Sequence, residues 1–431
     1  MHCCTRSGLP ELAERSFLSD MGIKSILTDS ENRKKILGLC YSIGAIGIFN
    51  AVIQFFVYPQ LEKDMGAASF GVALSVISII AIANNACGYA AGCARLLGSE
   101  KGHDNNGDYN LMLIIMGAIC AVIGGVYLYT LGLFSPLNVA LYCLLSFFTM
   151  LRFYSETEFK IKADFFRYMI YYVLISVGYV IGIFIFKLSG QWMLALLAGE
   201  VLCFIYAVVR SRLYRPPFFK ITKQFGQIFS SISFLLFSTL LENVTLHADK
   251  IVLLAITGDG KVVTTYYIAS LVGKVIAMLT TPINAIVLSY LVKYKGALTK
   301  KLWSIVTLAV SVGGAVVFAG CLVVSPFIIK LLYSESYDEA MIYLVPAILG
   351  QVLYFASGVL INTLLRFKGE RDQFIFNAVY AAEFFICVAV GTVLGGLMGF
   401  ALAVVFANAI RFIAAVIKGF VGKKQLEPEN V

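Results

Sequence analysis

The chain has 431 residues, of which 59% are hydrophobic and 14% are charged, and its mean hydropathy is +0.85. Soluble domains are roughly half apolar and about one quarter charged, so this composition excludes an ordinary soluble protein. The formal net charge of +9 does not indicate nucleic-acid binding, because the Lys and Arg residues lie in short clusters between apolar runs, as they do in the cytoplasmic loops of membrane proteins.

Twelve apolar segments follow one another along the chain, each bounded by charged or turn-forming residues. They span residues 36–57, 69–91, 111–133, 137–151, 166–186, 190–209, 227–254, 262–291, 302–324, 341–364, 373–394 and 397–417. Most have about 20 residues, the length that crosses a bilayer as a helix. Because an unpaired backbone group in lipid costs several kcal/mol, each segment is expected to be helical. The sequence therefore predicts an all-α integral membrane protein with about twelve transmembrane helices.

The loops between these segments alternate in Lys and Arg content. Loops on one side, together with the two ends, hold 28 of the 34 Lys and Arg residues, and this set includes Arg152. Loops on the other side hold five, and Lys274 lies inside a segment. Since cytoplasmic loops carry the excess of positive charge, both termini are expected in the cytoplasm.

The longest basic connection, which contains Pro216-Pro217, divides the twelve segments into two halves. The predicted organisation is a cytoplasmic N-terminal segment, a first six-helix lobe, a linker, a second six-helix lobe and a cytoplasmic tail, at 1–35, 36–209, 210–226, 227–417 and 418–431. The stretch before Met21 differs in character from the rest, so Met21 rather than Met1 is a hypothetical start of translation. An intact-mass measurement would decide between them.

Charged side chains inside apolar segments are costly, so each is expected to face a cavity or a partner. Tyr267, Ser270 and Lys274 recur at helical spacing and form one polar stripe with the lysine near mid-depth. Glu242 and Asp249 share a face of the preceding segment. Lys274 could therefore line a water-filled path, or it could pair with one of these carboxylates as an interhelical clamp.

Further polar residues lie in other segments. Asn50 and Gln54 align in the first segment, and Asn85 lies in the second on a face with two serines, which fits either a vestibule or interhelical hydrogen bonds. Glu200 and Glu383 have no evident partner and are open to a structural or a functional role. Arg411 lies near a cytoplasmic end, where an arginine side chain commonly reaches for the interface as an anchor.

Several kinds of chemistry find no support in the pattern. The ten cysteines show no metal-type spacing, and no nucleotide-binding loop or soluble domain interrupts the apolar segments. No catalytic residue, metal or cofactor is expected, and the chain is not expected to be an enzyme. Membrane polymerases and glycosyltransferases need a sizeable outer loop with catalytic acids or bases, and the predicted outer loops are short.

A set of loose motifs, in order along nearly the whole chain from about residue 21, resembles a known family. The motifs are Tyr58-Pro59-Gln60-Leu61 with Met65-Gly66-Ala67-Ala68-Ser69-Phe70-Gly71, His247-Ala248-Asp249-Lys250-Ile251-Val252-Leu253, Tyr266-Tyr267, Thr281-Pro282, Tyr333-Ser334-Glu335-Ser336-Tyr337, and the loop 366–372. They are similar to those of the polysaccharide repeat-unit (O-antigen and capsule) flippases of the multidrug/oligosaccharidyl-lipid/polysaccharide exporter superfamily.

The resemblance implies two six-helix lobes around a central cavity that opens alternately to either side of the membrane. It implies translocation of undecaprenyl-pyrophosphate-linked oligosaccharides, with a polysaccharide polymerase and chain-length proteins as partners. Lys274 and Lys250 would contact the anionic headgroup, and Asp249 or Glu242 would couple transport to an H⁺ or Na⁺ gradient. The first half departs from strongly cationic members, because no Arg or Lys is expected in its lumen. A drug or metabolite antiporter of the same superfamily is the main alternative, and a channel or scaffold is a third.

Overall fold

The computed structural model describes residues 30–99, 105–278, 298–368 and 370–421, and within these ranges every regular element is helical. The first half contains α3 (Ser30–Val52), the π-helical turn η1 (Ile53–Val57), α4 (Tyr58–Met65), α5 (Ala67–Ile80), a second π-helical turn η2 (Ala81–Asn85), α6 (Ala86–Ser99), α7 (Asn106–Thr130), α8 (Pro136–Ile161), α9 (Phe165–Ser189) and α10 (Trp192–Arg210). The second half contains α11 (Phe225–Thr257), α12 (Gly260–Met278), α14 (Lys300–Leu332), α15 (Tyr337–Lys368) and α16 (Glu370–Phe420). The predicted all-α fold is confirmed.

The helices account for the predicted apolar segments. Among the described residues, nine helices are long and apolar enough to cross a membrane, and α11 adds a tenth when its two parts, bent by 49°, are taken together. The 19-residue α12, which carries Lys274, corresponds to the start of the predicted segment 262–291. The later part of that segment, with Thr281 and Pro282, lies outside the described residues, as does the hypothetical start at Met21.

The last helix, α16, is a hairpin of two spans. Its backbone leaves helical geometry at Gly395 and Gly396, and Gly396 has a φ of +56°, which glycine adopts without a steric penalty. A β-carbon at Gly391 would lie 2.6 Å from the carbonyl oxygen of Gly399, so the two spans touch backbone to backbone beside the turn. This turn separates the predicted segments 373–394 and 397–417.

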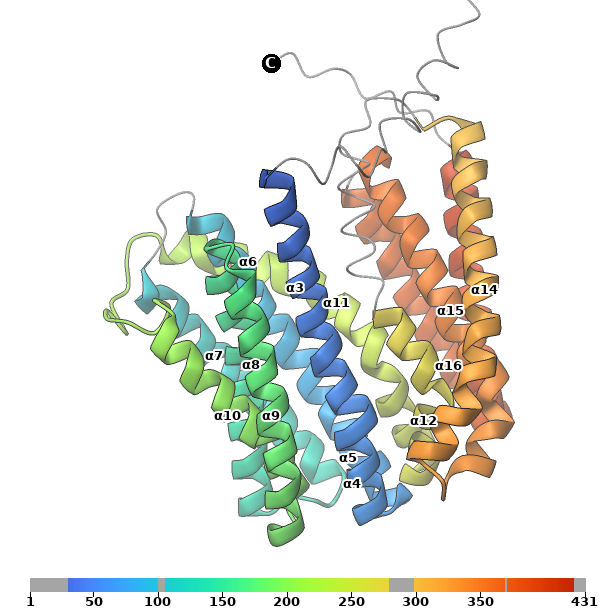
Figure 1. Cartoon of the computed structure of the whole chain (residues 1–431), viewed down its shortest axis with the longest axis horizontal. Coiled ribbons are helices and arrows are strands. Elements are labelled where there is room, and N and C mark those ends of the chain that lie inside the picture. The colour runs from blue at the N-terminus through green and yellow to red at the C-terminus, as the bar shows by residue number, and fades with distance from the viewer. Residues whose placement is uncertain (1–29, 100–104, 279–297, 369, 422–431) are drawn as a thin grey trace, which may run out of the picture.

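The helices form two lobes (Figure 1). Helices α3 to α10 pack into one bundle, in which α9 lies against α3 and α10. Helices α12, α14, α15 and α16 pack into another, in which α15 contacts the other three. The lobes meet where α5 and α6 contact α11 and α12. The predicted linker boundaries fall close to the end of α10 and the start of α11. The division into independent domains stays a prediction.

Helix α11 belongs to both lobes. Near its start, Ile228 and Ile232 pack in one hydrophobic cluster with Ala90 and Leu213 of the first lobe. Further along α11, Phe237 packs against Phe374 of α16, with ring centroids 6.0 Å apart, and Asp249 pairs with Lys274 of α12. A single helix therefore contacts both bundles.

The linker between α10 and α11 is held against the first lobe by side chains at the start of α7. The Asn106 amide donates hydrogen bonds to the carbonyl oxygens of Arg212 and Arg215, at 2.9 and 2.7 Å. The Asp108 carboxylate accepts from the backbone N–H and the hydroxyl of Thr222, at 2.8 and 2.6 Å. Burial raises the pKa of Tyr214, so its hydroxyl stays neutral within the linker. These bonds fix the linker to the first lobe up to the start of α11.

At the end of the molecule predicted to face outward, the backbones of the lobes touch. A β-carbon at Gly71 of α5 would lie 1.8 Å from the carbonyl oxygen of Gly260 at the start of α12. Next to it, the Thr264 hydroxyl donates a 2.6 Å hydrogen bond to the carbonyl oxygen of Ala67. Only glycine at position 71 allows this approach, so the contact holds the two lobes together at this end.

We expect Gly71→Ala to separate the lobes at this contact, because its methyl group would overlap the Gly260 backbone. Labelling at Thr264→Cys by a membrane-impermeant maleimide, applied from the predicted outer side, should rise several-fold when Gly71→Ala is added. Gly47→Ala is the matched control, since a β-carbon there has no heavy atom within 4 Å. Equal labelling with and without Gly71→Ala in folded protein would show that this contact does not close the outer end.

Candidate functional site

Three charged side chains predicted as site residues lie together between α11 and α12. The Asp249 carboxylate accepts from Lys274 Nζ at 2.5 Å and from Lys250 Nζ at 3.1 Å. The side chains are 9% exposed for Asp249, 14% for Lys274 and 10% for Lys250. Lys274 Nζ also lies 5.6 and 5.8 Å from the ring centroids of Tyr266 and Tyr267. We call Lys250, Asp249 and Lys274 the charged triad.

The charged triad has one more positive than negative charge. Lys274 pairs with Asp249, so the clamp geometry considered from the sequence is present in this conformation. One carboxylate cannot neutralise two ammonium groups, and a buried surplus charge favours the approach of an anion. Glu242, the other carboxylate considered as a partner, lies on α11, but its side chain is outside the described residues.

Tyr267 connects the charged triad to the contact between the lobes. Its hydroxyl donates a hydrogen bond to Gln54 Oε1 of the first lobe, and both side chains are buried. Ser270, one turn further along α12, donates to the carbonyl oxygen of Tyr267 at 3.1 Å. The structure thus brings together Lys274, Lys250, Asp249, Tyr267 and, across the lobe boundary, Gln54.

The other neutral candidates do not join this group by any hydrogen bond that the described residues show. Asn50 donates to the carbonyl oxygen of Ile46, one turn earlier in α3, at 3.0 Å. Asn85 is half-buried in η2, whereas its neighbour Asn84 is fully buried and accepts from Ser146 of α8 at 3.0 Å. The interhelical hydrogen bond expected in this region therefore comes from Asn84, a residue that the sequence analysis did not select.

Glu200 has a partner that the sequence analysis misplaced. Arg152 was expected in a cytoplasmic loop, and this expectation is wrong, because α8 continues to Ile161 and the arginine is 7% exposed. Arg152 Nε lies 3.1 Å from both carboxylate oxygens of Glu200, and Tyr179 donates to the same carboxylate at 2.8 Å. The guanidinium also contacts the ring of Phe153, 4.2 Å from its centroid. This pair places a cation inside the first lobe, and the expectation that the first-lobe lumen has no Arg or Lys stays a prediction.

A second buried carboxylate extends this network along α8. Glu156, one turn after Arg152, is 4% exposed and accepts from the Tyr172 hydroxyl of α9. Lys160, at 2.8 Å, provides its counter-charge. Periodic charged and aromatic residues in 152–161 were the sequence signal for a continuing helix, but their low hydropathy ended the predicted segment early.

Glu383 and Arg411 are separate from both groups. Glu383 is half-buried in α16, and its Oε1 atom has no hydrogen-bond partner among the described residues. Arg411 is 8% exposed, so its expected role as an interfacial anchor is wrong. Its guanidinium lies inside the second lobe, in contact with the rings of Tyr354 and Tyr380.

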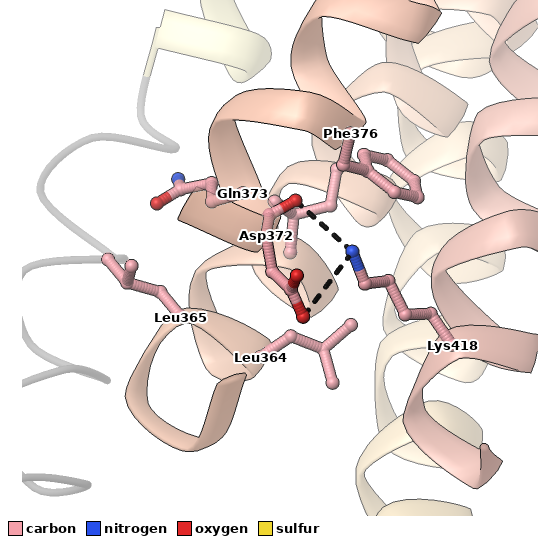
Figure 2. Close-up of a pocket in the computed structure, with 7 residues that line it drawn as sticks. Leu364, Leu365, Asp372, Gln373, Phe376 and Lys418 are labelled. Carbon is pink, nitrogen blue, oxygen red and sulfur yellow. Dashed lines mark hydrogen bonds and ion pairs between the residues drawn. The ribbon is translucent and has the colours of Figure 1, made fainter. Parts of the chain in front are cut away.

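The predicted cytoplasmic end of the second lobe is joined by an ion pair (Figure 2). Lys418 Nζ, near the end of α16, lies 3.1 Å from the carbonyl oxygen and 3.9 Å from the carboxylate of Asp372, near its start. Beside them, Gln373 and Phe376 line a cavity of about 10 Å³, too small to admit a substrate headgroup. This cluster fastens the two spans of α16 and the end of α15 together.

In the described ranges, no group of three or more His, Cys, Asp or Glu side chains is arranged to hold a metal ion. His247 lies on α11, two residues before Asp249 of the charged triad. The arrangement offers positive charge, tyrosine hydroxyls and amide groups, which bind and orient a polar molecule.

Known structures share this fold. The chain is similar to a structure of the lipid II flippase MurJ in an inward closed conformation, with 15% identity, a TM-score of 0.72, and coverage of 88% of this chain and 87% of that chain. An inward-facing multidrug resistance MATE family transporter of the MOP superfamily matches with 15% identity, a TM-score of 0.64, and coverage of 89% and 94%. A MATE structure in complex with MaL6 matches with 16% identity, a TM-score of 0.60, and coverage of 93% and 98%.

No protein-family model matches the chain, and no curated protein matches it by sequence. At these identities the structural likeness establishes the fold alone. The proteins that share this fold are transporters, and their two-lobed architecture is the one that the sequence resemblance implied. The chain is a multi-pass membrane protein with the fold of the multidrug/oligosaccharidyl-lipid/polysaccharide exporter superfamily.

Proposed function

We propose that the chain is a flippase that moves undecaprenyl-pyrophosphate-linked oligosaccharides across the cytoplasmic membrane of a bacterium. The observation that carries this proposal is the surplus positive charge of the charged triad, buried where α11 and α12 of the second lobe approach the first. A pyrophosphate headgroup is a compact anion that such a charge attracts. A fold shared with a lipid II flippase at a TM-score of 0.72 supports a lipid-linked substrate.

In the proposed mechanism, the headgroup competes with Asp249 for Lys274 and Lys250. When the anion binds, Asp249 loses part of its compensation, and its affinity for H⁺ or Na⁺ rises. Binding of either ligand then changes the relative stability of the two lobe arrangements. Glu200, Glu383 and Glu242 are further candidates for ion coupling. Both termini would lie on the cytoplasmic side, and a polysaccharide polymerase with chain-length proteins would receive the product.

Tyr267 and Ser270 fit a role beside this headgroup site. Tyr267 bonds to Gln54 across the lobe boundary, so separation of the lobes would free both polar groups for the sugar or phosphate. Asn50 and Asn85 are proposed contacts of the sugar on the first-lobe side. The hydroxyl and amide groups offer hydrogen bonds without an added charge, which suits a neutral or weakly acidic oligosaccharide.

A liposome assay tests the function directly. Purified protein in liposomes that carry a fluorescent undecaprenyl-pyrophosphate-linked oligosaccharide should make the inner-leaflet pool accessible to an external quencher, faster when a proton or sodium gradient is imposed. Empty liposomes and liposomes with Lys274→Ala protein are the controls. Gradient-driven transport of cationic dyes with no movement of the lipid would replace the flippase with the multidrug antiporter.

A further inference from the structure

Arg411 is a buried cation between two aromatic rings. It lies in the second span of α16, about 13 Å along the helix from the end at Phe420, and is 8% exposed. The guanidinium carbon is 4.5 Å from the ring centroid of Tyr354 in α15 and 4.3 Å from that of Tyr380 in the first span of α16. The Tyr380 hydroxyl donates a 2.8 Å hydrogen bond to Asn408, which keeps that ring in place.

This guanidinium is only partly paired. Its Nε and Nη1 atoms are buried and have no hydrogen-bond partner among the described residues. None of the ion pairs between described residues includes Arg411. Three N–H bonds of a permanently charged group therefore point to places where the described chain offers no acceptor.

Arg152 provides an internal comparison. Both arginines are buried to a similar degree and contact aromatic rings, but Arg152 binds the Glu200 carboxylate through both of its oxygens. A buried cation without such a partner has lost its hydration and gains no charge compensation in return, and contacts with aromatic faces offset only part of this loss. Arg411 therefore lacks the paired carboxylate that Arg152 has.

We propose that Arg411, Tyr354 and Tyr380 form a binding site for a small inorganic anion of the size of chloride. The two rings lie against the guanidinium, and its Nε and Nη1 atoms are the donors that an anion would satisfy. Enclosure of the side chain excludes a sugar or a lipid headgroup from contact. The site is independent of the charged triad and of the molecule that the chain transports.

Thermal unfolding in lipid nanodiscs tests this site. The wild-type protein should melt at a higher temperature, by on the order of 5 °C, in sodium chloride than in sodium gluconate of equal ionic strength, because gluconate is too large for the site. Arg411→Gln should lose this difference. In gluconate, Arg411→Gln should be at least as stable as the wild type, because it removes an uncompensated buried charge.

Arg167→Gln is the matched control, since Arg167 is an exposed arginine paired with Asp164, and it should keep the full chloride effect. If Arg411→Gln does not fold, Arg411→Lys, which retains the charge, should keep part of the effect. Equal wild-type melting temperatures in the two salts would overturn the proposal. Stabilisation by pyrophosphate but not by chloride, lost in Arg411→Gln, would overturn it in favour of a substrate headgroup site.

Discussion

Lys274→Ala is expected to reduce translocation to the level of cells that lack the protein. Lys274 contributes one of the two positive charges of the charged triad, and without it Asp249 and Lys250 neutralise each other. No surplus charge then remains to attract a pyrophosphate. Surface polysaccharide, measured in a bacterial strain that depends on this chain, should fall to background, while the amount of protein in the membrane stays close to wild type.

The protein is expected to fold because Asp249 keeps Lys250 as a partner, so no carboxylate is left unpaired. Lys261→Ala is the matched control, because Lys261 lies on the same helix as Lys274. This substitution removes only an exposed ion pair with Glu339 of α15. Wild-type polysaccharide in the Lys274→Ala strain would remove this residue from the mechanism. If Lys274 acts only as a clamp for Asp249, adding Asp249→Asn to Lys274→Ala should restore transport. If Lys274 contacts the substrate, the double variant should remain inactive.

The second large effect is on stability. Arg152→Met should lower the free energy of unfolding by about 3–5 kcal/mol, because it leaves the Glu200 carboxylate buried without its counter-charge. The melting temperature of the purified protein should fall by roughly 10 °C, and less protein should accumulate in the membrane. The loss is measured by heating samples stepwise and determining, by size-exclusion chromatography, the fraction of protein that remains folded.

A double variant separates charge imbalance from lost packing. Adding Glu200→Gln to Arg152→Met removes the unpaired carboxylate and keeps an acceptor for Tyr179, so most of the lost stability should return. Arg167→Met should change stability by less than about 1 kcal/mol, since that pair is exposed. Equal losses in Arg152→Met and Arg167→Met would show that the buried pair contributes no more than a surface pair.

The course of the chain through the membrane could be predicted from sequence because each span needs a long apolar run. This rule placed the end of α10 near Arg210 and separated the two spans of α16 near Gly395. It failed at the end of α8, where most residues from Arg152 to Phe159 are polar but are buried against neighbouring helices. Hydropathy predicts which residues contact lipid, and it cannot predict that a polar residue is buried with a partner inside a lobe.

The candidate site was predictable in part for the same reason. The spacing of Tyr267, Ser270 and Lys274 placed them on one helix, and the cost of a buried lysine pointed to a carboxylate on the preceding one. Sequence alone did not indicate which carboxylate, because that choice depends on the crossing of α11 and α12. It also could not show that Arg411 lies between Tyr354 and Tyr380, which are 57 and 31 positions earlier in the chain.

The bend in α11 has a mechanical consequence. It lies between Leu241 and Asn243, about 21 Å along the helix from Thr257 and about 25 Å from Phe225. If the lobes rotate about this point, the two ends of α11 move by nearly equal amounts in opposite directions. Separation of the lobes at one end of the molecule then brings them together at the other end. A pivot at half-height would therefore couple opening toward one compartment to closing toward the other.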